Sequence, residues 1–345
     1  MSNPVTIPQI AEAAGVSTAT VDRVLNNRPG VNPTTVHKVR EAMASLGASA
    51  PMRGRPRSTS NYRFAFVLPA TRRGFFDQVD RVIAQAAGDF RHQHITEITH
   101  RVPVSDANVC AAELLKLADL DGIALLAPDV PQVKLAINEL VRAGVHVVTL
   151  FSDVPGSMRE SAMGTDNRAA GRTAGLLLGR SMPREQAVSC ALFSPATRYA
   201  AEIDRRIGFQ QVLEERFPRV QVRRLFELPE SEDEAFEYAR AMLARDGEVR
   251  APLAGIYNVG PGSFGIARAM TEHGYGHELT FITHDLLEVH RSMLISGTLG
   301  YVLHQDVYYT VTAAARVLRA LCDGVRGALA AGNPRVEILT DENLA

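Results

Sequence analysis

The 345-residue sequence contains no apolar run long enough to cross a membrane, and its polar start, Met1–Pro4, lacks the pattern of a signal peptide. It has only three cysteines, Cys110, Cys190 and Cys322, which are widely separated and lie among apolar residues. This usage favours buried free thiols in a reducing compartment over a disulfide framework. We therefore expect a cytoplasmic protein.

The sequence also lacks the short motifs of common enzyme classes. It has no G-x-S-x-G, no H-E-x-x-H and no pair of cysteines at metal-binding spacing. His92 and His94 lie in a polar stretch, and His273 and His277 flank a Gly-Tyr-Gly turn, so both pairs are expected on the surface. We expect no metal, no cofactor and no catalytic residues.

Charge is distributed unevenly along the chain, although its net charge is only −1. Residues 1–60 contain seven Lys and Arg against three Asp and Glu, whereas residues 61–345 contain 30 against 35. A basic N-terminal part and a mildly acidic remainder suit a protein that contacts phosphate groups at one end only. The length, with 46% hydrophobic residues, allows more than one domain with a core of its own.

Residues 1–47 have the pattern of a three-helix, all-α head that contains a helix-turn-helix. Thr6 is placed to cap a first helix with Pro8 near its start, and Gly15 stands in the turn after it. Ser17 is placed to cap a second helix, and a third is expected over about 33–46. The apolar side chains expected to form the core of this head are Ile10, Ala11, Ala13, Ala14, Val21, Val24, Leu25, Val36, Val39, Ala42, Met43 and Leu46.

The second helix is the predicted DNA-reading element. Its apolar stripe leaves Thr18, Ala19, Asp22 and Arg23 facing outward, and a short helix with small side chains and one Arg suits the major groove. We predict base contacts from Thr18, Ala19 and Arg23. A small helical cap on an enzyme is the alternative interpretation. The full predicted DNA-binding set of the head is Thr6, Ser17, Thr18, Ala19, Thr20, Arg23, Asn26 and Thr34.

This stretch resembles the start of the LacI family of bacterial transcription regulators. The residues that carry the resemblance are Val5-Thr6-Ile7, Ile10-Ala11, Ala14-Gly15-Val16-Ser17, Thr20-Val21, Arg23-Val24-Leu25-Asn26, Val31 and Leu46-Gly47. Asp22 departs from the Ser that the family has there. The resemblance implies a repressor that binds double-stranded, pseudo-palindromic operator DNA. A homodimer is expected, because paired heads multiply the phosphate contacts, and a tetramer is left open.

Residues 48–61 are predicted to be a linker, since they are rich in Ala, Gly, Pro, Ser and Arg and have almost nothing to bury. The family resemblance implies a hinge helix here with a Leu wedge for the minor groove, but Arg57 stands at the wedge position and Gly54 and Pro56 disfavour a helix. The run 53–57, Arg-Gly-Arg-Pro-Arg, instead resembles an AT-hook. We hypothesise that Arg55 and Arg57 enter a narrow minor groove, with a solvated basic linker as the alternative.

From residue 62 onward, short apolar runs alternate with amphipathic stretches, as in βαβ units with parallel sheets. Strands are predicted over 63–68, 122–126, 145–150, 187–193, 221–225, 253–257 and 279–283, and helices over 75–90, 132–143, 167–181, 200–216, 231–245 and 263–273. This region resembles the effector domains of the LacI family, which implies a two-lobed α/β body like that of periplasmic sugar-binding proteins. The body is expected over 62–345, with one lobe at 62–163 plus 305–332 and the other at 164–304 plus 333–345.

Polar side chains at the carboxyl ends of the predicted strands form a candidate effector site, because open α/β sheets bind ligands there. Carboxylates and amides accept hydroxyl hydrogens, and an Arg and aromatic faces complete what a polyhydroxylated ligand needs. Taken singly, an Asp after a strand is also a common cap or turn residue, and two Phe residues also suit a core. The predicted effector-binding set is Arg73, Phe75, Phe76, Asp129, Asp153, Arg205, Asn258, Asp285 and Gln305.

The family resemblance implies sugar contacts for six members of this set, namely Phe75, Phe76, Arg205, Asn258, Asp285 and Gln305. Arg73 stands before the Phe pair, and a cation there would favour an acidic or phosphorylated sugar. The ligand class expected from the sequence is therefore a sugar, a polyol, a sugar acid or a sugar phosphate.

Two other protein classes remain as alternatives to a sugar-responsive regulator. The run Gly260–Gly265 matches G-x-G-x-x-G after a strand, with Asp285 about twenty residues on, which fits an NAD-linked enzyme on spacing alone. The motif lies late in the chain, however, after several βα units. A transport-type sugar-binding protein would share the body but would lack the head and would carry a signal peptide.

Overall fold

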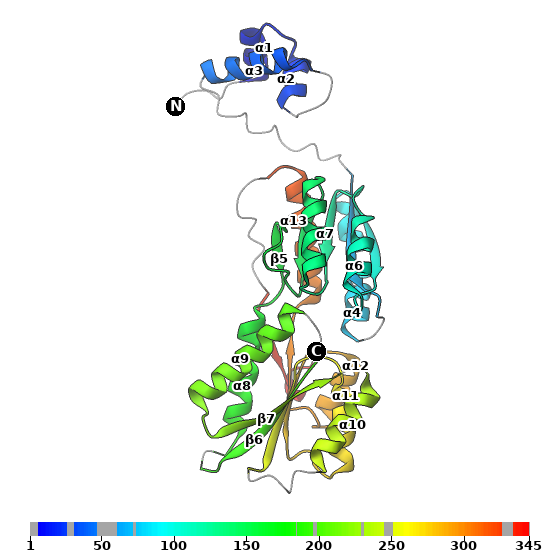
Figure 1. Ribbon diagram of the computed structural model, residues 1–345, viewed down its shortest axis with the longest axis vertical. Helices are drawn as coiled ribbons and strands as arrows, with labels where there is room; N and C mark the ends of the chain where they lie inside the picture. The colour runs from blue at the N-terminus through cyan, green and yellow to red at the C-terminus, as the bar shows by residue number, and fades with distance from the viewer. Residues whose placement is uncertain are drawn as a thin grey trace. The chain divides into compact units, whose positions relative to one another are not determined.

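The computed structural model describes residues 6–25, 31–46, 61–71, 74–183, 185–195, 199–228, 231–244, 251–325 and 334–344. The chain divides into two compact units (Figure 1). Residues 1–59 contain the predicted head and most of the predicted linker, and residues 60–345 contain the predicted body. Four predicted site residues, Asn26, Arg55, Arg57 and Arg73, lie outside the described residues. So does the predicted linker up to residue 60.

Three helices make up the described part of the head, and they are α1 (Ile7–Ala14), α2 (Thr18–Leu25) and α3 (Pro33–Ser45). A capping box begins α1, in which the backbone N–H of Thr6 donates to Gln9 Oε1 at 2.8 Å. Gly15 ends this helix with a φ of 64°. At the start of α2, Ser17 Oγ accepts from the backbone N–H of Thr20 at 3.2 Å. The predicted boundary signals of both helices are confirmed.

The core of the head is small and apolar, and its buried members are Ile10, Ala11, Val21, Val24 and Val39. Two predicted core residues, Ala13 and Leu46, are exposed instead. Ala13 lies at the edge of the apolar stripe of α1, and Leu46 follows the last turn of α3. The predicted all-α, three-helix head is nevertheless confirmed.

The described strands of the body form two sheets. The first has the order β2-β1-β3-β4-β5, all parallel, with β1 (Tyr62–Pro69), β2 (Ile95–Val102), β3 (Gly122–Leu125), β4 (His146–Leu150) and β5 (Ser161–Met163). The second has the order β11-β10-β9-β8-β6-β7, with β6 (Val188–Pro195), β7 (Val220–Leu228), β8 (Leu253–Asn258), β9 (Thr280–His284), β10 (Tyr301–His304) and β11 (Glu337–Leu339). Only the β10–β11 pair is antiparallel within these described strands. The predicted α/β body with two parallel-sheet lobes is confirmed.

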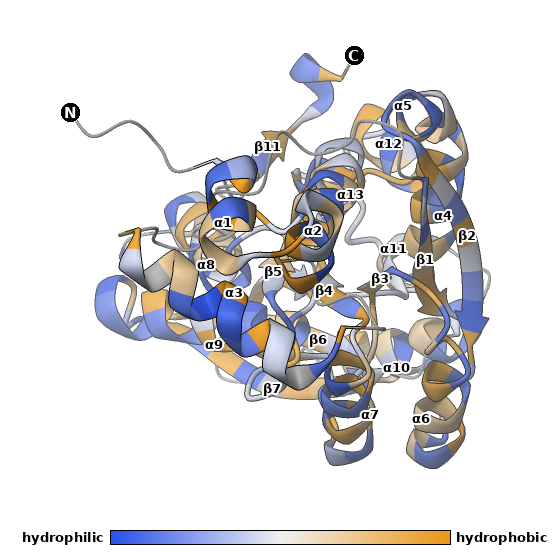
Figure 2. Cartoon of the chain, turned by 90° about the horizontal axis from the view of Figure 1, so that it is seen from above, coloured by the Kyte–Doolittle hydropathy of each residue, from blue (hydrophilic) through white to orange (hydrophobic). Residues whose placement is uncertain are grey.

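Helices cover the sheets as the βα alternation predicts. Along the first sheet lie α4 (Phe75–Gln85), α5 (Ala87–His92), α6 (Ala107–Leu115), α7 (Pro131–Arg142) and α13 (Val307–Cys322). The second sheet carries α8 (Asn167–Ser181), α9 (Ala200–Arg216), α10 (Glu232–Leu243), α11 (Ser263–Glu272) and α12 (Glu288–Ile295). In Figure 2, α6 and α7 carry both hydrophilic and hydrophobic residues, as covering helices do. None of the described helices is long and apolar enough to cross a membrane.

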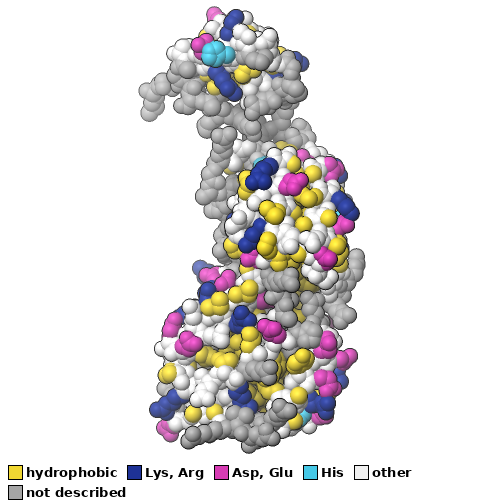
Figure 3. All heavy atoms as spheres, in the orientation of Figure 1, with side chains coloured by type: hydrophobic (Ala, Val, Ile, Leu, Met, Phe, Trp, Pro, Cys, Tyr) yellow, Lys and Arg dark blue, Asp and Glu magenta, His cyan; other side chains and the backbone are white. Residues whose placement is uncertain are grey.

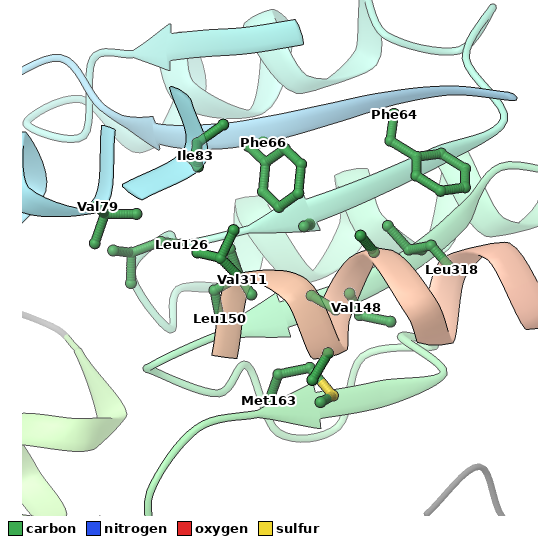
Figure 4. Packing of buried hydrophobic residues seen from close by; sticks show 14 of the residues in the cluster. Phe64, Phe66, Val79, Ile83, Leu126, Val148, Leu150, Met163, Val311 and Leu318 are labelled. Carbon is green, nitrogen blue, oxygen red and sulfur yellow. The ribbon is translucent and has the colours of Figure 1, made fainter. Parts of the chain in front are cut away.

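The core of the first lobe shows why α13 returns to it late in the chain. Val311 and Leu318 of α13 are fully buried in one cluster with Phe64, Phe66 and Val148 of the sheet (Figure 4). Burying two such aliphatic side chains stabilises the lobe by roughly 1.5–3 kcal/mol each. The chain therefore crosses between the lobes more than once, at the β5–α8 and β10–α13 connections.

Candidate ligand-binding and DNA-binding sites

A cavity of about 190 Å³ lies in the body, and its walls come from both lobes. Loops at the carboxyl ends of β1, β3, β4, β8, β9 and β10 line it, which is where parallel sheets place ligands. Five of the predicted effector-binding residues meet there, namely Phe75, Phe76, Arg205, Asp285 and Gln305. The sequence-based set therefore converges only in part on this cavity.

Aromatic side chains form one wall of the cavity. Phe75 and Phe76 begin α4, directly after Gly74, whose φ of 53° turns the chain into the helix. The Phe75 ring stands edge-on to Phe151, with centroids 5.0 Å apart, and Phe76 faces Tyr199 at 6.4 Å. Such faces suit the C–H surfaces of a sugar ring.

Arg205 reaches the cavity from α9, and hydrogen bonds to other residues of the protein fix its side chain. Its side chain is buried, with the residue 7% exposed, and Nε donates to Asn167 Oδ1 at 2.7 Å. Nη1 donates to the carbonyl oxygen of Val259 at 3.3 Å. Asn167 in turn donates from Nδ2 to the carbonyl oxygen of Phe151 at 3.1 Å, which ties Arg205 to the end of β4. The guanidinium is thus fixed in place before any ligand binds.

Asp285 and Gln305 form a polar pair in the lining of the same cavity. Gln305 Nε2 donates to Asp285 Oδ1 at 2.9 Å, and both residues are buried. Asp285 has a φ of 61°, and its carbonyl oxygen accepts from His290 Nδ1 at 2.6 Å. Gln305 Oε1 is buried with no hydrogen-bond partner among the described residues. A buried acceptor of this kind calls for a donor, and a ligand hydroxyl group supplies one.

Two buried histidines lie beside this pair without adding positive charge. Tyr257 and His284 Nε2 share a hydrogen bond of 2.7 Å. Burial lowers the pKa of His284 well below its usual value, and the nearby Arg205 lowers it further. Burial also lowers the pKa of His290. Both rings are therefore neutral near pH 7.

Three predicted effector-binding residues do not line the cavity. Asn258 lies behind its wall and donates from Nδ2 to the carbonyl oxygens of Gly260 and Pro261 at 2.8 and 3.0 Å, so it supports the turn. Asp129 forms an ion pair with Lys134 at 2.8 Å. Asp153 forms one with Arg159 and accepts from Thr149 Oγ1 at 2.9 Å. These contacts are all to residues near in sequence, and Asn258 Oδ1 is buried with no hydrogen-bond partner among the described residues.

The glycine-rich turn after β8 has an internal partner that the sequence did not reveal. Glu232, at the start of α10, accepts from the backbone N–H groups of Gly262 and Gly265 at 3.3 and 2.8 Å. A Cβ at Gly265 would lie 2.0 Å from the carbonyl oxygen of Glu232, so helix packing requires this glycine. A carboxylate therefore occupies the amides that a dinucleotide pyrophosphate would need.

Arg101 of β2 holds the loop that carries the aromatic wall. Its Nη1 donates to the carbonyl oxygens of Pro69 and Thr71 at 2.9 and 3.4 Å. Its Nη2 forms an ion pair with Asp80 of α4 at 2.6 Å. This one side chain joins the end of β1, the loop and α4, and it does so from the strand next to β1.

We expect Arg101→Met to weaken ligand binding about tenfold, because the loss of charged donors costs about 1.5–3 kcal/mol and frees the loop. Isothermal titration measures the affinity, and circular dichroism checks the fold. Arg63→Met is the control, since Arg63 pairs with Asp119 on an exposed surface at 3.1 Å, where ion pairs contribute little. Equal ligand affinities in the two variants would contradict the role of Arg101.

In the head, α2 presents the predicted base-contacting side chains to solvent. Thr18, Ala19 and Arg23 are exposed, whereas Asp22 is half-buried. Thr6, Ser17 and Thr34 are exposed, and Thr20 is half-buried with its hydroxyl 2.9 Å from that of Ser17. The described residues of the chain contain no group of three or more His, Cys, Asp or Glu placed to hold a metal ion.

The two units define the class of protein: a helix-turn-helix head followed by a two-lobed ligand-binding body. The family model described as periplasmic binding protein domain matches residues 64–325, and the model described as bacterial regulatory proteins, lacI family, matches residues 6–47. The chain belongs to the periplasmic binding protein domain family through its body. The lacI family model matches the head alone, so the chain joins a LacI-type helix-turn-helix head to this periplasmic-binding-protein-like body.

Curated relatives are similar over part of the chain. HTH-type transcriptional regulator MalR of Streptomyces coelicolor is 41% identical over 80 residues, 23% of each chain. MalR of Streptococcus pneumoniae is 31% identical over 144 residues, 39% of this chain and 43% of the relative. The chain thus spans less than half the length of these relatives.

Solved structures are similar over the body. The glucose-galactose binding protein GanP of Geobacillus stearothermophilus matches with a TM-score of 0.71 at 21% identity, over 83% of this chain and 99% of that one. A putative LacI transcriptional regulator from Bacteroides fragilis matches with a TM-score of 0.68 at 18% identity, over 82% and 98%. At these identities the likeness establishes the fold.

Proposed function

We propose that this protein is a DNA-binding transcription regulator, a repressor, whose operator affinity is controlled by a small sugar-like effector. The observation that carries the proposal is the cavity between the lobes, with the Phe75 and Phe76 wall facing Arg205, Asp285 and Gln305. Hydroxyl acceptors, a fixed donor and an aromatic face match a polyhydroxylated ligand. The exposed α2 supplies the DNA-binding half of the function.

The effector acts by favouring one arrangement of the two lobes. Gln78 of α4 donates to the carbonyl oxygen of Leu286 at 3.3 Å, and the backbone N–H of Ala201 donates to Ser152 Oγ at 3.2 Å. Both bonds join one lobe to the other beside the cavity. A ligand that contacts both walls strengthens this closed arrangement, and it shifts operator affinity only by its difference in affinity between the arrangements.

The protein is proposed to act in the cytoplasm as a homodimer on a pseudo-palindromic operator. A single small head makes few phosphate contacts, and two heads on paired half-sites multiply them. Charges on the visible face of the body are interspersed in sign (Figure 3), so this face presents no continuous cationic surface to phosphate groups.

Neither alternative class accounts for these features as well. A transport-type binding protein does not bind DNA, so that class does not explain α2 with its exposed Arg23. An NAD-linked enzyme needs the amides of the Gly260–Gly265 turn, which Glu232 occupies. The curated relatives that the chain resembles over part of its length are transcription regulators, and we propose that this protein is likewise not an enzyme.

Selection of bound sequences from random duplex DNA tests the proposal. The full-length protein is expected to enrich a two-fold symmetric sequence, and a sugar or polyol identified by thermal shift is expected to change its affinity for that sequence. Failure to enrich any sequence would contradict the DNA-binding half. An enriched operator that no sugar-like compound affects would contradict the effector half.

Arg23→Ala is expected to weaken binding to the selected operator by about 1–3 kcal/mol and to relax specificity at one position of each half-site. The physical reason is the loss of a bidentate base contact from the exposed face of α2. Fluorescence anisotropy with operator and single-base variants measures both effects. A uniform loss on every sequence, including scrambled DNA, would identify Arg23 as a phosphate contact instead.

A further inference from the structure

We propose that the cavity selects an uncharged sugar or polyol and rejects sugar phosphates and sugar acids. This inference rests on the proposed function and narrows its ligand class, which the sequence left open to all four. Two groups in the cavity could bind an anion, the N-terminus of α11 and the side chain of Arg205. Both already make hydrogen bonds to other parts of the protein.

The first such group is the N-terminus of α11. Helix N-termini attract anions because their backbone N–H groups lack intrahelical partners. Here Glu232 already accepts from Gly262 and Gly265, the turn residues that begin this helix. A phosphate would have to displace a carboxylate that belongs to the chain itself and that α10 holds in place.

Other carboxylates surround the same turn. Glu202 of α9 lies on its other side, where Oε1 would be 3.5 Å from a Cβ added at Gly260. Asp285 follows β9, and all three acidic residues line the cavity. An anionic ligand would therefore face three carboxylates, of which Asp285 is buried and Glu202 and Glu232 are half-buried, and like charges at this distance repel one another.

The second potential anion receptor is Arg205, the only Lys or Arg among the described lining residues. Bidentate pairing with a carboxylate or phosphate uses two parallel N–H groups of the guanidinium. Nε already donates to Asn167 and Nη1 to the carbonyl oxygen of Val259, so the side-on fork is closed. One N–H on Nη1 and two on Nη2 remain to donate to ligand oxygens, so Arg205 offers fewer donors than a free guanidinium, and the neutral His284 and His290 add no second cation.

An uncharged ligand meets none of these obstacles. Its hydroxyl groups donate to Asp285 and to the unpartnered Gln305 Oε1, and its C–H face lies against Phe75 and Phe76. The cavity of about 190 Å³ is below the roughly 300–1,000 Å³ of pockets for drug-sized ligands, which points to a single ring or a short polyol.

Isothermal titration of the full-length protein tests the inference with matched ligands: neutral hexoses, pentoses and their alditols, the corresponding aldonic acids, and the corresponding sugar phosphates. We expect a neutral compound to bind at least tenfold more tightly than its own acid and phosphate. Tightest binding by an anionic compound would overturn the inference while leaving the proposed function intact. Binding by no compound of any class would contradict the sugar-like effector itself.

Glu232→Gln provides the matched variant, since it removes the charge and keeps the length of the side chain. The ratio of affinities for the neutral sugar and its phosphate is expected to fall at least tenfold. Glu234→Gln, on the same turn of α10 but exposed, should leave the ratio unchanged.

Glu202→Gln is the second test, because it removes a charge without touching the amides of the turn. The inference would be overturned if neither Glu232→Gln nor Glu202→Gln changed the ratio of affinities for the neutral sugar and its phosphate. It would also be overturned if the wild type bound an anionic compound and Arg73→Ala abolished that binding.

Discussion

Replacing Gly171 with alanine is expected to destabilise the body by about 3 kcal/mol and to weaken ligand binding. A Cβ at this position of α8 would lie 1.9 Å from the carbonyl oxygen of Arg205 and 2.6 Å from its carbonyl carbon. Both are backbone atoms that no rotamer change moves, so α8 and α9 would have to separate. Thermal unfolding should show a decrease in Tm of roughly 6–12 °C, at about 2–4 °C per kcal/mol for a domain of this size.

Gly88→Ala is the control for this substitution. Gly88 lies in α5, and nothing stands within 4 Å of a Cβ added there. Alanine is favoured over glycine in helices by up to about 1 kcal/mol, so this variant should be as stable as the wild type or slightly more stable. Equal Tm values for the two variants would show that α8 and α9 do not approach as closely as described. Loss of ligand affinity in Gly171→Ala is expected because Arg205 stands at the contact.

Asp285→Asn is expected to lower ligand affinity about tenfold to a hundredfold. The charged acceptor of the polar pair is lost, and hydrogen bonds to charged groups contribute about 1.5–3 kcal/mol. Asparagine is chosen because the φ of 61° at this position is tolerated by Asp and Asn but strains most other residues. The remaining amide oxygen still accepts from Gln305, so the substitution changes the ligand contact with little change in the fold.

Asp129→Asn is the matched control, since both aspartates follow predicted strands and both belong to the predicted effector-binding set. Asp129 pairs with Lys134 and does not line the cavity. Its substitution should leave the dissociation constant unchanged within error in the same titration. A comparable loss in both variants would contradict the assignment of the ligand site to the cavity.

Local sequence signals predicted the elements whose boundaries depend on nearby residues. The helices expected over 167–181 and 200–216 have those bounds in α8 and α9. In α8 the side chain of Asp166 accepts from the backbone N–H of Ala169, a local N-cap that fixes the start. Ser17 does the same in the head. Such signals need no knowledge of the rest of the chain.

Sequence reasoning missed several elements, among them α6 and α13, and some of the missed elements lack a clear periodic pattern. β2 is an edge strand in which only Ile95 and Val102 are buried, so its polar residues conceal it. The single helix predicted over 75–90 is divided at Ala86 into α4 and α5. α12 spans only eight residues and was not predicted.

Only part of the ligand site could be predicted from the sequence, because the path of each loop depends on distant parts of the chain. The strand-end rule places Asp129, Asp153 and Asp285 equally, and only the paths of the loops decide which of them faces a cavity. Glu202 and Glu232 were missed because a Glu near the start of a helix is an ordinary residue in sequence. Their role arises where α9, α10 and the turn after β8 meet, which is a long-range relation.

The glycines of α8 have a consequence for how a signal leaves the cavity. Gly171, Gly175 and Gly179 recur every fourth residue, and an added Cβ at each would lie within 2.4 Å of α9 or of Phe217 just beyond it. The two helices lie side by side in Figure 1. An added Cβ would meet the backbone of Arg205 at Gly171, and the side chains of Val212 and Phe217 at Gly175 and Gly179. The backbone of Arg205 therefore cannot shift unless α8 moves as well. We expect this part of the second lobe to move as one rigid unit, because the packing leaves little room for side-chain rearrangement. A small movement of a bound ring that displaces Arg205 is therefore transmitted to the whole of α8.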